Sequence, residues 1–255
     1  MSFSKRAFST QKRNLNLERC PLLSSCLAVP IGQVEYLPAW ELQKSLHKQV
    51  SEGMLPNLLL LLEHSHVYTL GRRGKISEVK VPAGKLAELG AKVHFTDRGG
   101  EVTYHGPGQL IVYPIVNLRL MPGGPSRYIH TLEKVLIDTL EEFGIMGESV
   151  GKPTGVWVGD AKIAAIGVKI SRGVTMHGLA LNVNPDLSYF NHIVPCGMID
   201  ISVTSMSTLL SKDLDVREVL PSVVRCFERL FEWKIRWVEL EDLGHHSDKY
   251  YSAAC

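Results

Sequence analysis

The alternation of hydrophobic and polar residues predicts two amphipathic helices in the first part of the chain. In residues 40–50, apolar side chains recur every three to four positions, which is the period of a helix with one buried face. Residues 126–143 show the clearest helical pattern, because apolar residues occupy one face and charged residues mostly occupy the other. Gly144 follows this second segment and is a natural helix stop.

A third helix is expected over residues 216–233. Asp215 and Glu218 have the spacing of a capping box, and Pro221 would kink the helix near its start. Cys226 lies on the apolar face of this helix, so we interpret it as a packed core residue.

Apolar runs predict buried strands between the helices. Residues 57–71 indicate one buried strand that continues past two histidines and stops at a glycine. Residues 91–96 alternate and predict another strand, and residues 109–118 predict a further buried one. Pro114 lies inside this last run and has no backbone N–H, which favours an edge position or a bulge.

Residues 155–184 predict a meander of hairpins. The pairs Gly159-Asp160 and Arg172-Gly173 are tight-turn sequences between β-rich runs. Hairpins with helices between them, and few β-α-β alternations, predict an α+β domain. Its sheet should be mixed but largely antiparallel and packed with helices.

The composition is that of an ordinary globular protein. The 255 residues are 45% hydrophobic and 21% charged, and the net charge of +2 is too small to indicate nucleic-acid binding. The longest leucine run, residues 58–62, is far too short to span a bilayer. No repeat or low-complexity linker is visible, so we expect one domain at residues 29–240 and a polar tail at 241–255.

The amino-terminal segment, residues 1–28, has a different composition. Its first twenty residues are basic and contain several Ser and Thr, with no acidic residue before Glu18. This composition is typical of a mitochondrial transit peptide, and a disordered basic tail is the alternative.

Five widely spaced cysteines form no CxxC pair, which supports neither a zinc ribbon nor a disulfide framework and favours a reducing compartment. They are Cys20, Cys26, Cys196, Cys226 and Cys255. We place three of them in the terminal segments and expect every cysteine except Cys196 to be dispensable for chemistry. Cys196 lies between Pro195 and Gly197, a backbone that can present a thiol from a turn, and a packed core cysteine is the alternative.

A cysteine nucleophile requires a partner that stabilises its thiolate. Lys162 follows the Gly159-Asp160 turn, and an ammonium close to Cys196 would lower the pKa of the thiol. His177 and His192 are rival partners, and the sequence does not rank the three. A solvated hairpin residue is the alternative interpretation of this lysine.

The stretch from Arg98 to Val116 combines four glycines with several hydrogen-bonding side chains. It is not a phosphate-binding P-loop, because the sequence GK[ST] does not follow the glycines. It is not a dinucleotide-binding fingerprint either, because a strand follows where that motif has a helix. We interpret it as turns that also form a wall against which a ligand packs. His64 and His66 are spaced to share one face of a strand, and without a recognisable third ligand they favour a structural or substrate-wall role over zinc.

The motifs "RGGEVTYHGPGQL", "TGVWVGDAKIAAIGV", "MHGLALNV" and "HIVPCG" together resemble the LipB family of lipoyl(octanoyl) transferases. The resemblance extends from about residue 34 to about residue 210 and is closest to the mitochondrial members. It implies the fold of the biotin and lipoate protein ligase catalytic module. It also implies that Cys196 carries an acyl thioester and that Lys162 lowers the pKa of its thiol.

The resemblance further implies three acyl-binding segments. Their residues are Arg98, Gly99, Gly100, Glu101, Val102, Thr103, Tyr104 and His105, then Ala165, Ile166 and Gly167, and finally Gly178, Leu179 and Ala180.

The implied reaction moves an octanoyl or lipoyl group from acyl carrier protein to a lysine of an apo lipoyl domain. The expected acceptors are the 2-oxoacid dehydrogenase complexes and the glycine cleavage H protein. No ATP, metal, nucleic acid or membrane span is expected, and the protein should be a mitochondrial monomer. Lys162, His177 and His105 are alternative bases for the second step. An ATP-dependent lipoate ligase and a non-catalytic binding module are the rival functions.

Overall fold

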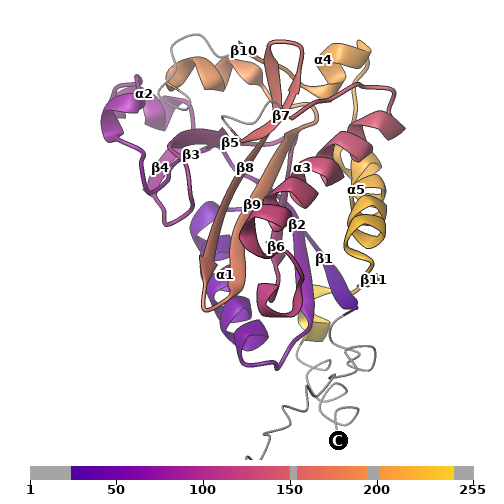
Figure 1. The fold of residues 1–255 in the computed structure, drawn as a ribbon. Coiled ribbons are helices and arrows are strands. Elements are labelled where there is room, and N and C mark those ends of the chain that lie inside the picture. The colour runs from indigo at the N-terminus through magenta and orange to yellow at the C-terminus, as the bar shows by residue number, and fades with distance from the viewer. Residues whose placement is uncertain (1–23, 150–153, 195–201, 244–255) are drawn as a thin grey trace, which may run out of the picture.

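The computed structural model describes residues 24–149, 154–194 and 202–243, and its main element is an eight-stranded mixed sheet. Seven strands follow the order β10-β8-β9-β6-β2-β1-β11, and β7 pairs with β8 (Figure 1). Most pairs are antiparallel, so the predicted α+β class with a largely antiparallel sheet is confirmed. The strands are β1 (Ser25–Val34), β2 (Asn57–His64), β6 (Gln109–Ile115), β7 (Gly155–Val158), β8 (Ala161–Ser171), β9 (Val174–Asn182), β10 (Ser202–Val203) and β11 (Lys234–Trp237).

A second, three-stranded sheet lies beside the upper part of the main one. It has the order β4-β3-β5, formed by β3 (Val67–Leu70), β4 (Lys92–Phe95) and β5 (Val102–His105). The prediction of one strand over residues 57–71 is therefore wrong, because the chain leaves the main sheet after His64 and enters the small sheet at Val67. All of these strand residues except Glu63 are buried, so burial on both sides of Ser65 and His66 makes two strands resemble one.

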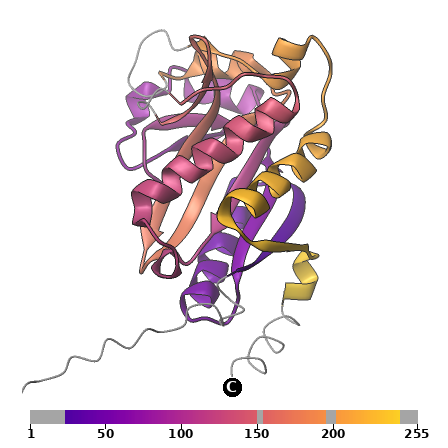
Figure 2. The same ribbon diagram turned by 45° about the vertical axis from the view of Figure 1, so that its right-hand side comes forward.

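Helices cover both faces of the main sheet. The pair α3 (Gly124–Glu142) and α5 (Val216–Phe231) packs together on one face, as Figure 2 shows, and α1 (Tyr36–Ser51) contacts β9 and β6 on the other. These three elements confirm the predicted helices, and Phe143 and Gly144 end α3 as expected. The shorter helices are α2 (Ala83–Glu88), α4 (Met206–Leu210) and four 3₁₀ turns, η2 (Ile76–Glu78), η3 (Leu118–Leu120), η4 (Leu187–His192) and η6 (Leu240–Asp242).

The start of α5 is built as its sequence predicts. Asp215 and Glu218 form a reciprocal capping box, in which the side chain of each residue accepts the backbone N–H of the other. Pro221 lies inside the helix, which continues to Phe231. Cys226 is fully buried in the core, as predicted.

The hairpins at residues 155–184 are confirmed, but the position of β6 is not. Arg172 and Gly173 both have positive φ, which is the geometry of a tight hairpin turn. β6 lies between β2 and β9 in the interior of the sheet, so Pro114 does not mark an edge strand. Backbone pairing of β6 with β9 runs from Gln109 to Val112 and stops short of the proline.

The domain begins earlier and ends later than the sequence predicts. β1 starts at Ser25 and pairs with β2 and β11, so part of the expected amino-terminal segment belongs to the sheet. Cys26 is fully buried there, which corrects its assignment to a terminal tail. Leu243 is also buried and extends the fold past residue 240. Within the described residues, no helix is long and apolar enough to cross a membrane.

Candidate active site

A cavity of about 570 Å³ lies between the main sheet and the small sheet. β8 and β9 supply one side of it, and the loop before β5 supplies the other. A volume of this size is ordinary for a site that holds a small organic group.

Most of the residues proposed from the sequence line this cavity. They are Lys162, Arg98, Gly99, Gly100, Glu101, Val102, Thr103, His105, Ala165, Ile166, Gly167, Gly178, Leu179 and Ala180. Tyr104 points elsewhere, since its hydroxyl bonds to Nδ1 of His66 at 2.7 Å and its ring stacks on Tyr189. Cys196 lies outside the described residues. Phe190 and Val203, on the two described flanks of that segment, line the cavity.

Arg98 acts as an internal brace of the glycine loop. Its buried guanidinium donates to the carbonyl of Thr69 at 2.6 Å, to that of Gly99 at 2.9 Å and to that of Glu101 at 2.8 Å. Hydrogen bonds from a charged donor are stronger than neutral ones, so this residue ties the loop to β3. The sequence predicted a polar wall here. It did not reveal that the guanidinium of Arg98 donates its hydrogen bonds to backbone carbonyls of the protein itself.

Two glycines are required by the geometry of the cavity wall. Gly100 has a φ of 89°, a backbone conformation that is unfavourable for residues other than glycine. At Gly178, an added Cβ would lie 2.2 Å from the carbonyl oxygen of Val112, so no larger residue fits without moving β6. Glycine at these two positions therefore lets the backbone of both cavity-lining segments keep its observed path.

Lys162 lies at one end of the cavity. Its Nζ donates to the carbonyl of Thr154 at 3.0 Å and lies over the ring of Trp157 at 5.5 Å from the centroid. β10 pairs with β8 here, placing Val203 beside Lys162. The chain therefore re-enters the described part of the sheet, at Ser202 and Val203, directly next to the lysine.

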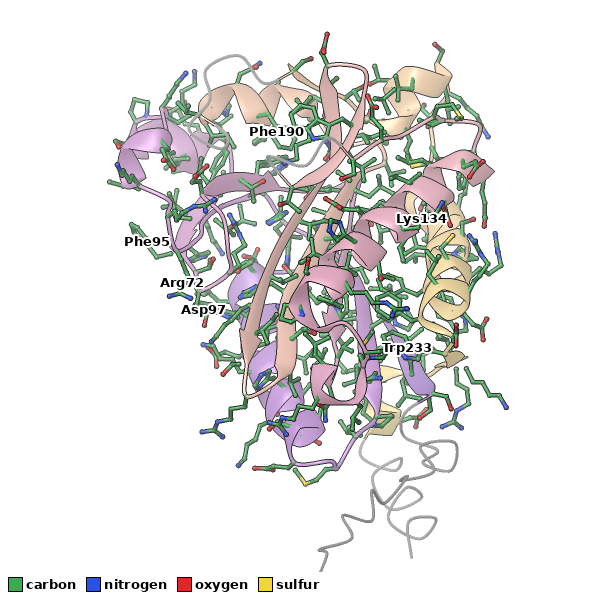
Figure 3. All side chains as sticks on the ribbon, viewed as in Figure 1. Arg72, Phe95, Asp97, Lys134, Phe190 and Trp233 are labelled. Carbon is green, nitrogen blue, oxygen red and sulfur yellow. The ribbon has the colours of Figure 1, made fainter. Side chains whose placement is uncertain are left out.

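His177 lies toward the opposite end. It pairs with Val168, six residues beyond Lys162 along β8, which corresponds to roughly 20 Å in a strand. Its Nε2 bonds to Asp97 at 2.7 Å, and burial lowers the pKa of this imidazole although Asp97 opposes the change. In Figure 3, Asp97 lies at the side of the molecule, below the level of Phe190. His177 and Lys162 cannot both act on one atom.

The other histidines have distinct partners. Nδ1 of His192 bonds to the hydroxyl of Tyr68 at 2.8 Å, below η4 and away from the cavity lining. Nε2 of His64 bonds to the hydroxyl of Tyr113 at 2.7 Å. His64 and His66 do not share one strand face, because the chain changes sheets between them. Among the described residues, no group of three or more His, Cys, Asp or Glu could hold a metal ion.

His105 takes part in a buried chain of hydrogen bonds. Its Nδ1 bonds to Oε1 of Gln109 at 2.7 Å, and Nε2 of Gln109 donates to Oδ1 of Asn182 at 2.8 Å. Nδ2 of Asn182 then donates to the carbonyl of Thr204 at 3.0 Å. Sequence analysis singled out neither Asn182 nor Thr204. Their importance depends on strand register, which no local pattern in the sequence reveals.

The main sheet and the small sheet beside it thus form a domain with a cavity of the size that holds a small organic group. A family model described as the lipoyl protein ligase A/B catalytic domain matches residues 35–228. The chain belongs to this family.

Two named relatives show which class of enzyme within the family this chain resembles. The chain is 43% identical over 215 residues to the mitochondrial octanoyltransferase LIP2 of Arabidopsis thaliana, covering 82% of this chain and 90% of the relative. It is 45% identical to an octanoyltransferase of Solibacter usitatus, covering 84% of this chain and 96% of the relative. The protein is thus an acyltransferase, and its resemblance to the transferases of this family is confirmed.

Solved structures agree on the fold. A lipoate-protein ligase A bound with ATP aligns with a TM-score of 0.67 at 15% identity, covering 90% of this chain and 94% of that one. A bipartite lipoate protein ligase from Thermoplasma acidophilum aligns with a TM-score of 0.65 at 15% identity, covering 90% and 92%. At this identity the likeness concerns the fold alone.

Proposed function

We propose that this protein transfers an octanoyl group from acyl carrier protein to a lysine of an apo lipoyl domain, the first step of protein lipoylation. The transfer passes through a thioester on Cys196. The observation that supports the proposal is the pairing of Val203 with Lys162, because Val203 follows Cys196 by only seven residues and the lysine lines the same cavity as the residues that we propose to bind the acyl chain.

The first half-reaction exchanges one thioester for another. The thiolate of Cys196 attacks the octanoyl carbonyl, the new C–S bond forms, and the bond to the carrier's sulfur breaks. The ammonium of Lys162 stabilises the attacking thiolate and then gives its proton to the departing sulfur. Exchange between thioesters is close to thermoneutral, so the enzyme must chiefly orient the groups and stabilise the oxyanion.

The second half-reaction forms the amide. The amine of the acceptor lysine attacks the acyl carbonyl, the C–N bond forms, and the electron pair of the breaking C–S bond returns to Cys196. Neutral Lys162, which has already lost its proton, accepts the proton of the amine. An amide is far less reactive than a thioester, so this step drives the sequence forward without ATP or metal.

The acyl chain would extend along the sheet from Lys162 toward His177. The small residues Ala165, Gly167, Gly178 and Ala180 face one another across β8 and β9 on this route and line the cavity. Eight carbons are shorter than the roughly 20 Å between the two ends. The cavity is therefore long enough for octanoyl and for lipoyl, which has the same eight-carbon chain with two added sulfur atoms.

The partners and the location follow from the same reaction. The donor is acyl carrier protein, and the acceptors are lipoyl domains of 2-oxoacid dehydrogenase complexes and the glycine cleavage H protein. The basic amino-terminal residues and the similarity to a mitochondrial relative support import into mitochondria. The protein should act as a monomer and need neither nucleic acid nor a membrane.

Two rival functions predict different requirements. An ATP-dependent lipoate ligase would activate a free acid as an adenylate and would not need Cys196. A non-catalytic module would bind a lipoyl domain without turnover. Transfer from an acyl-carrier thioester in the absence of nucleotide separates the proposal from both.

The decisive experiment is intact-mass analysis after mixing the full chain with octanoyl-carrier protein and no acceptor. We expect a mass increase of one octanoyl group, mapped to Cys196 and absent in Cys196→Ala. An adduct that survives this substitution, or a chain that requires ATP to acylate its acceptor, would overturn the proposal.

A further inference from the structure

The buried hydrogen-bond chain from His105 to Thr204 has only one direction. A carbonyl oxygen can only accept, so Asn182 must turn its NH₂ group toward Thr204 and its oxygen toward Gln109. Gln109 must then donate to Asn182 and present its own oxygen to His105. The carbonyl of Tyr104 supports this orientation, since it accepts from the same amide nitrogen at 3.4 Å.

This direction fixes the tautomer of His105. Facing the oxygen of Gln109, Nδ1 must carry the proton, so Nε2 of the neutral ring keeps its lone pair. All four residues of the hydrogen-bond chain are buried: His105 is 7% exposed, Gln109 2%, Asn182 4% and Thr204 6%. Water therefore has little access with which to reverse the arrangement.

The chain of hydrogen bonds that begins at His105 ends beside Lys162. The backbone N–H of Thr204 donates to the carbonyl of Lys162 at 3.0 Å. Gln109 on β6 pairs with Asn182 on β9, and the neighbouring residue of β9, Leu181, pairs with Ala164 of β8, two residues from Lys162. Only β9 separates β6 from β8, so Gln109 and this part of β8 are about 10 Å apart. His105 and Lys162 both line the cavity.

We propose that Nε2 of His105 is a fixed hydrogen-bond acceptor that receives an N–H of the incoming lysine amine and aims the nitrogen lone pair at the acyl carbonyl. The role rests on the proposed function and adds a substrate-orienting residue to it. A reacting carbonyl between His105 and Lys162 would lie within reach of both side chains. The proton of the amine still goes to Lys162, and His105 changes no bond.

The electrostatic surroundings suit an acceptor better than a proton carrier. Burial lowers the pKa of His105 to about 3, and His64, Arg98 and His177 act in the same direction while Gln109 opposes them. The ring therefore stays neutral throughout the working pH range and keeps its lone pair at Nε2. A general base works best when its pKa lies near the operating pH, which this group does not satisfy.

Two substitutions at one position separate acceptor function from bulk. His105→Leu removes the acceptor, and His105→Gln can place an amide oxygen where Nε2 lies. Single-turnover transfer from acylated enzyme to an apo lipoyl domain should slow roughly tenfold or more in His105→Leu, the size expected for one lost hydrogen bond, and should largely recover in His105→Gln. Acylation of the enzyme by octanoyl-carrier protein should change less than about twofold in both.

His130→Gln is the matched control, because that histidine is exposed on α3 and is not among the residues that line the cavity. It should leave both half-reactions unchanged. Equal slowing of acylation and transfer by His105→Leu would indicate a structural role and overturn the proposal, as would normal transfer in that variant.

The tautomer has its own test, which does not depend on activity. Nitrogen-15 NMR of the labelled full chain should show His105 protonated at Nδ1 from pH 5 to pH 8. A ring protonated at Nε2, or a charged ring in that range, would overturn the inference. If the wild-type chain forms no acyl adduct, the proposed function fails and the role of His105 fails with it, whereas the NMR result still reports the tautomer.

Discussion

Pro114 on β6 lies opposite His177 on β9, and the backbone groups of both residues bond to side chains. The register of the two strands sets this pairing, because Val112 pairs with Leu179 and the N–H of Thr175 donates to the carbonyl of Val116. A proline has no N–H to give to the ladder. His177 adopts a φ of 56° and donates its N–H to Oε1 of Gln43 on α1 at 2.8 Å.

The first prediction follows from this arrangement. Gln43→Leu should lower the free energy of unfolding by about 1 to 3 kcal/mol, because the buried N–H of His177 loses its acceptor. Urea denaturation measures the change. Gln49→Leu, on the same helix but only partly buried, is the control and should cost less than about 0.5 kcal/mol. Equal stability of the two variants would contradict the assigned role of Gln43.

The second prediction concerns stability in acid. Burial lowers the pKa of His64 to about 4, and both ring nitrogens are already bonded, Nδ1 to the carbonyl of Val34 and Nε2 to the hydroxyl of Tyr113. Its stabilising contribution is therefore complete above about pH 6.5 and is lost as the pH falls toward 4. That loss should be on the order of 3 kcal/mol.

Urea unfolding at several pH values tests this dependence. His64→Gln should flatten the slope of stability against pH between 4 and 6.5, and His130→Gln, with its exposed ring, should not. A slope that is the same in wild type and His64→Gln would assign the acid sensitivity to other groups.

The third prediction concerns Lys162. Removing its charge in Lys162→Ala should raise the pKa of the Cys196 thiol and shift the pH dependence of alkylation upward. Lys162→Arg keeps the charge but cannot accept a proton, so acylation should survive better than transfer to the lipoyl domain. Single-turnover acylation and deacylation across pH measure both effects. Unchanged alkylation in Lys162→Ala would mean that another group sets the thiolate.

The fourth prediction separates buried cysteines from the proposed nucleophile. Cys26 and Cys226 are fully buried, and burial raises the pKa of both thiols. Native enzyme should therefore resist alkylation at these two positions. Cys26→Ala and Cys226→Ala should each cost about 1 kcal/mol or more of stability and leave the acyl adduct intact. Loss of the adduct in a folded variant would contradict the assignment.

The fifth prediction uses two deletions at the amino terminus. Removing residues 1–20 should leave activity in solution intact and end mitochondrial delivery of a tagged chain. Removing residues 1–29 should prevent folding, because it takes away half of β1, which pairs with β2 on one side and β11 on the other. Circular dichroism, transferase assays and imaging provide the readouts. Unchanged mitochondrial delivery after removal of residues 1–20 would show that this segment is only a basic tail and not an import signal.

Local physical rules account for what the sequence determined by itself. The helical period of α3, the capping box of α5 and the tight turns between β7, β8 and β9 all depend on residues a few positions apart. The α+β class follows from the order of such elements. The motifs around Lys162 and Cys196 also sufficed to indicate the family, because four of them occur in order in one chain.

Tertiary structure alone decided which strand lies beside which. The apolar run at residues 57–71 is divided between two sheets, and β6 is central despite Pro114. Cys26 joins the core because β1 finds partners far along the chain in β2 and β11. Periodicity reports whether a residue is buried, but the identity of the covering residue depends on contacts across long sequence separations.

The proton position on His105 shows the same limit at atomic scale. The sequence places Gln109 four residues away, but the oxygen that orients its amide comes from Asn182, which in turn is oriented by the carbonyl of Thr204. These partners are 73 and 22 residues apart in the chain. The sequence therefore determined which side chains are available for chemistry. Only the register of β6, β8 and β9 decided which nitrogen of His105 carries the proton, because hydrogen-bond direction passes from one buried group to the next.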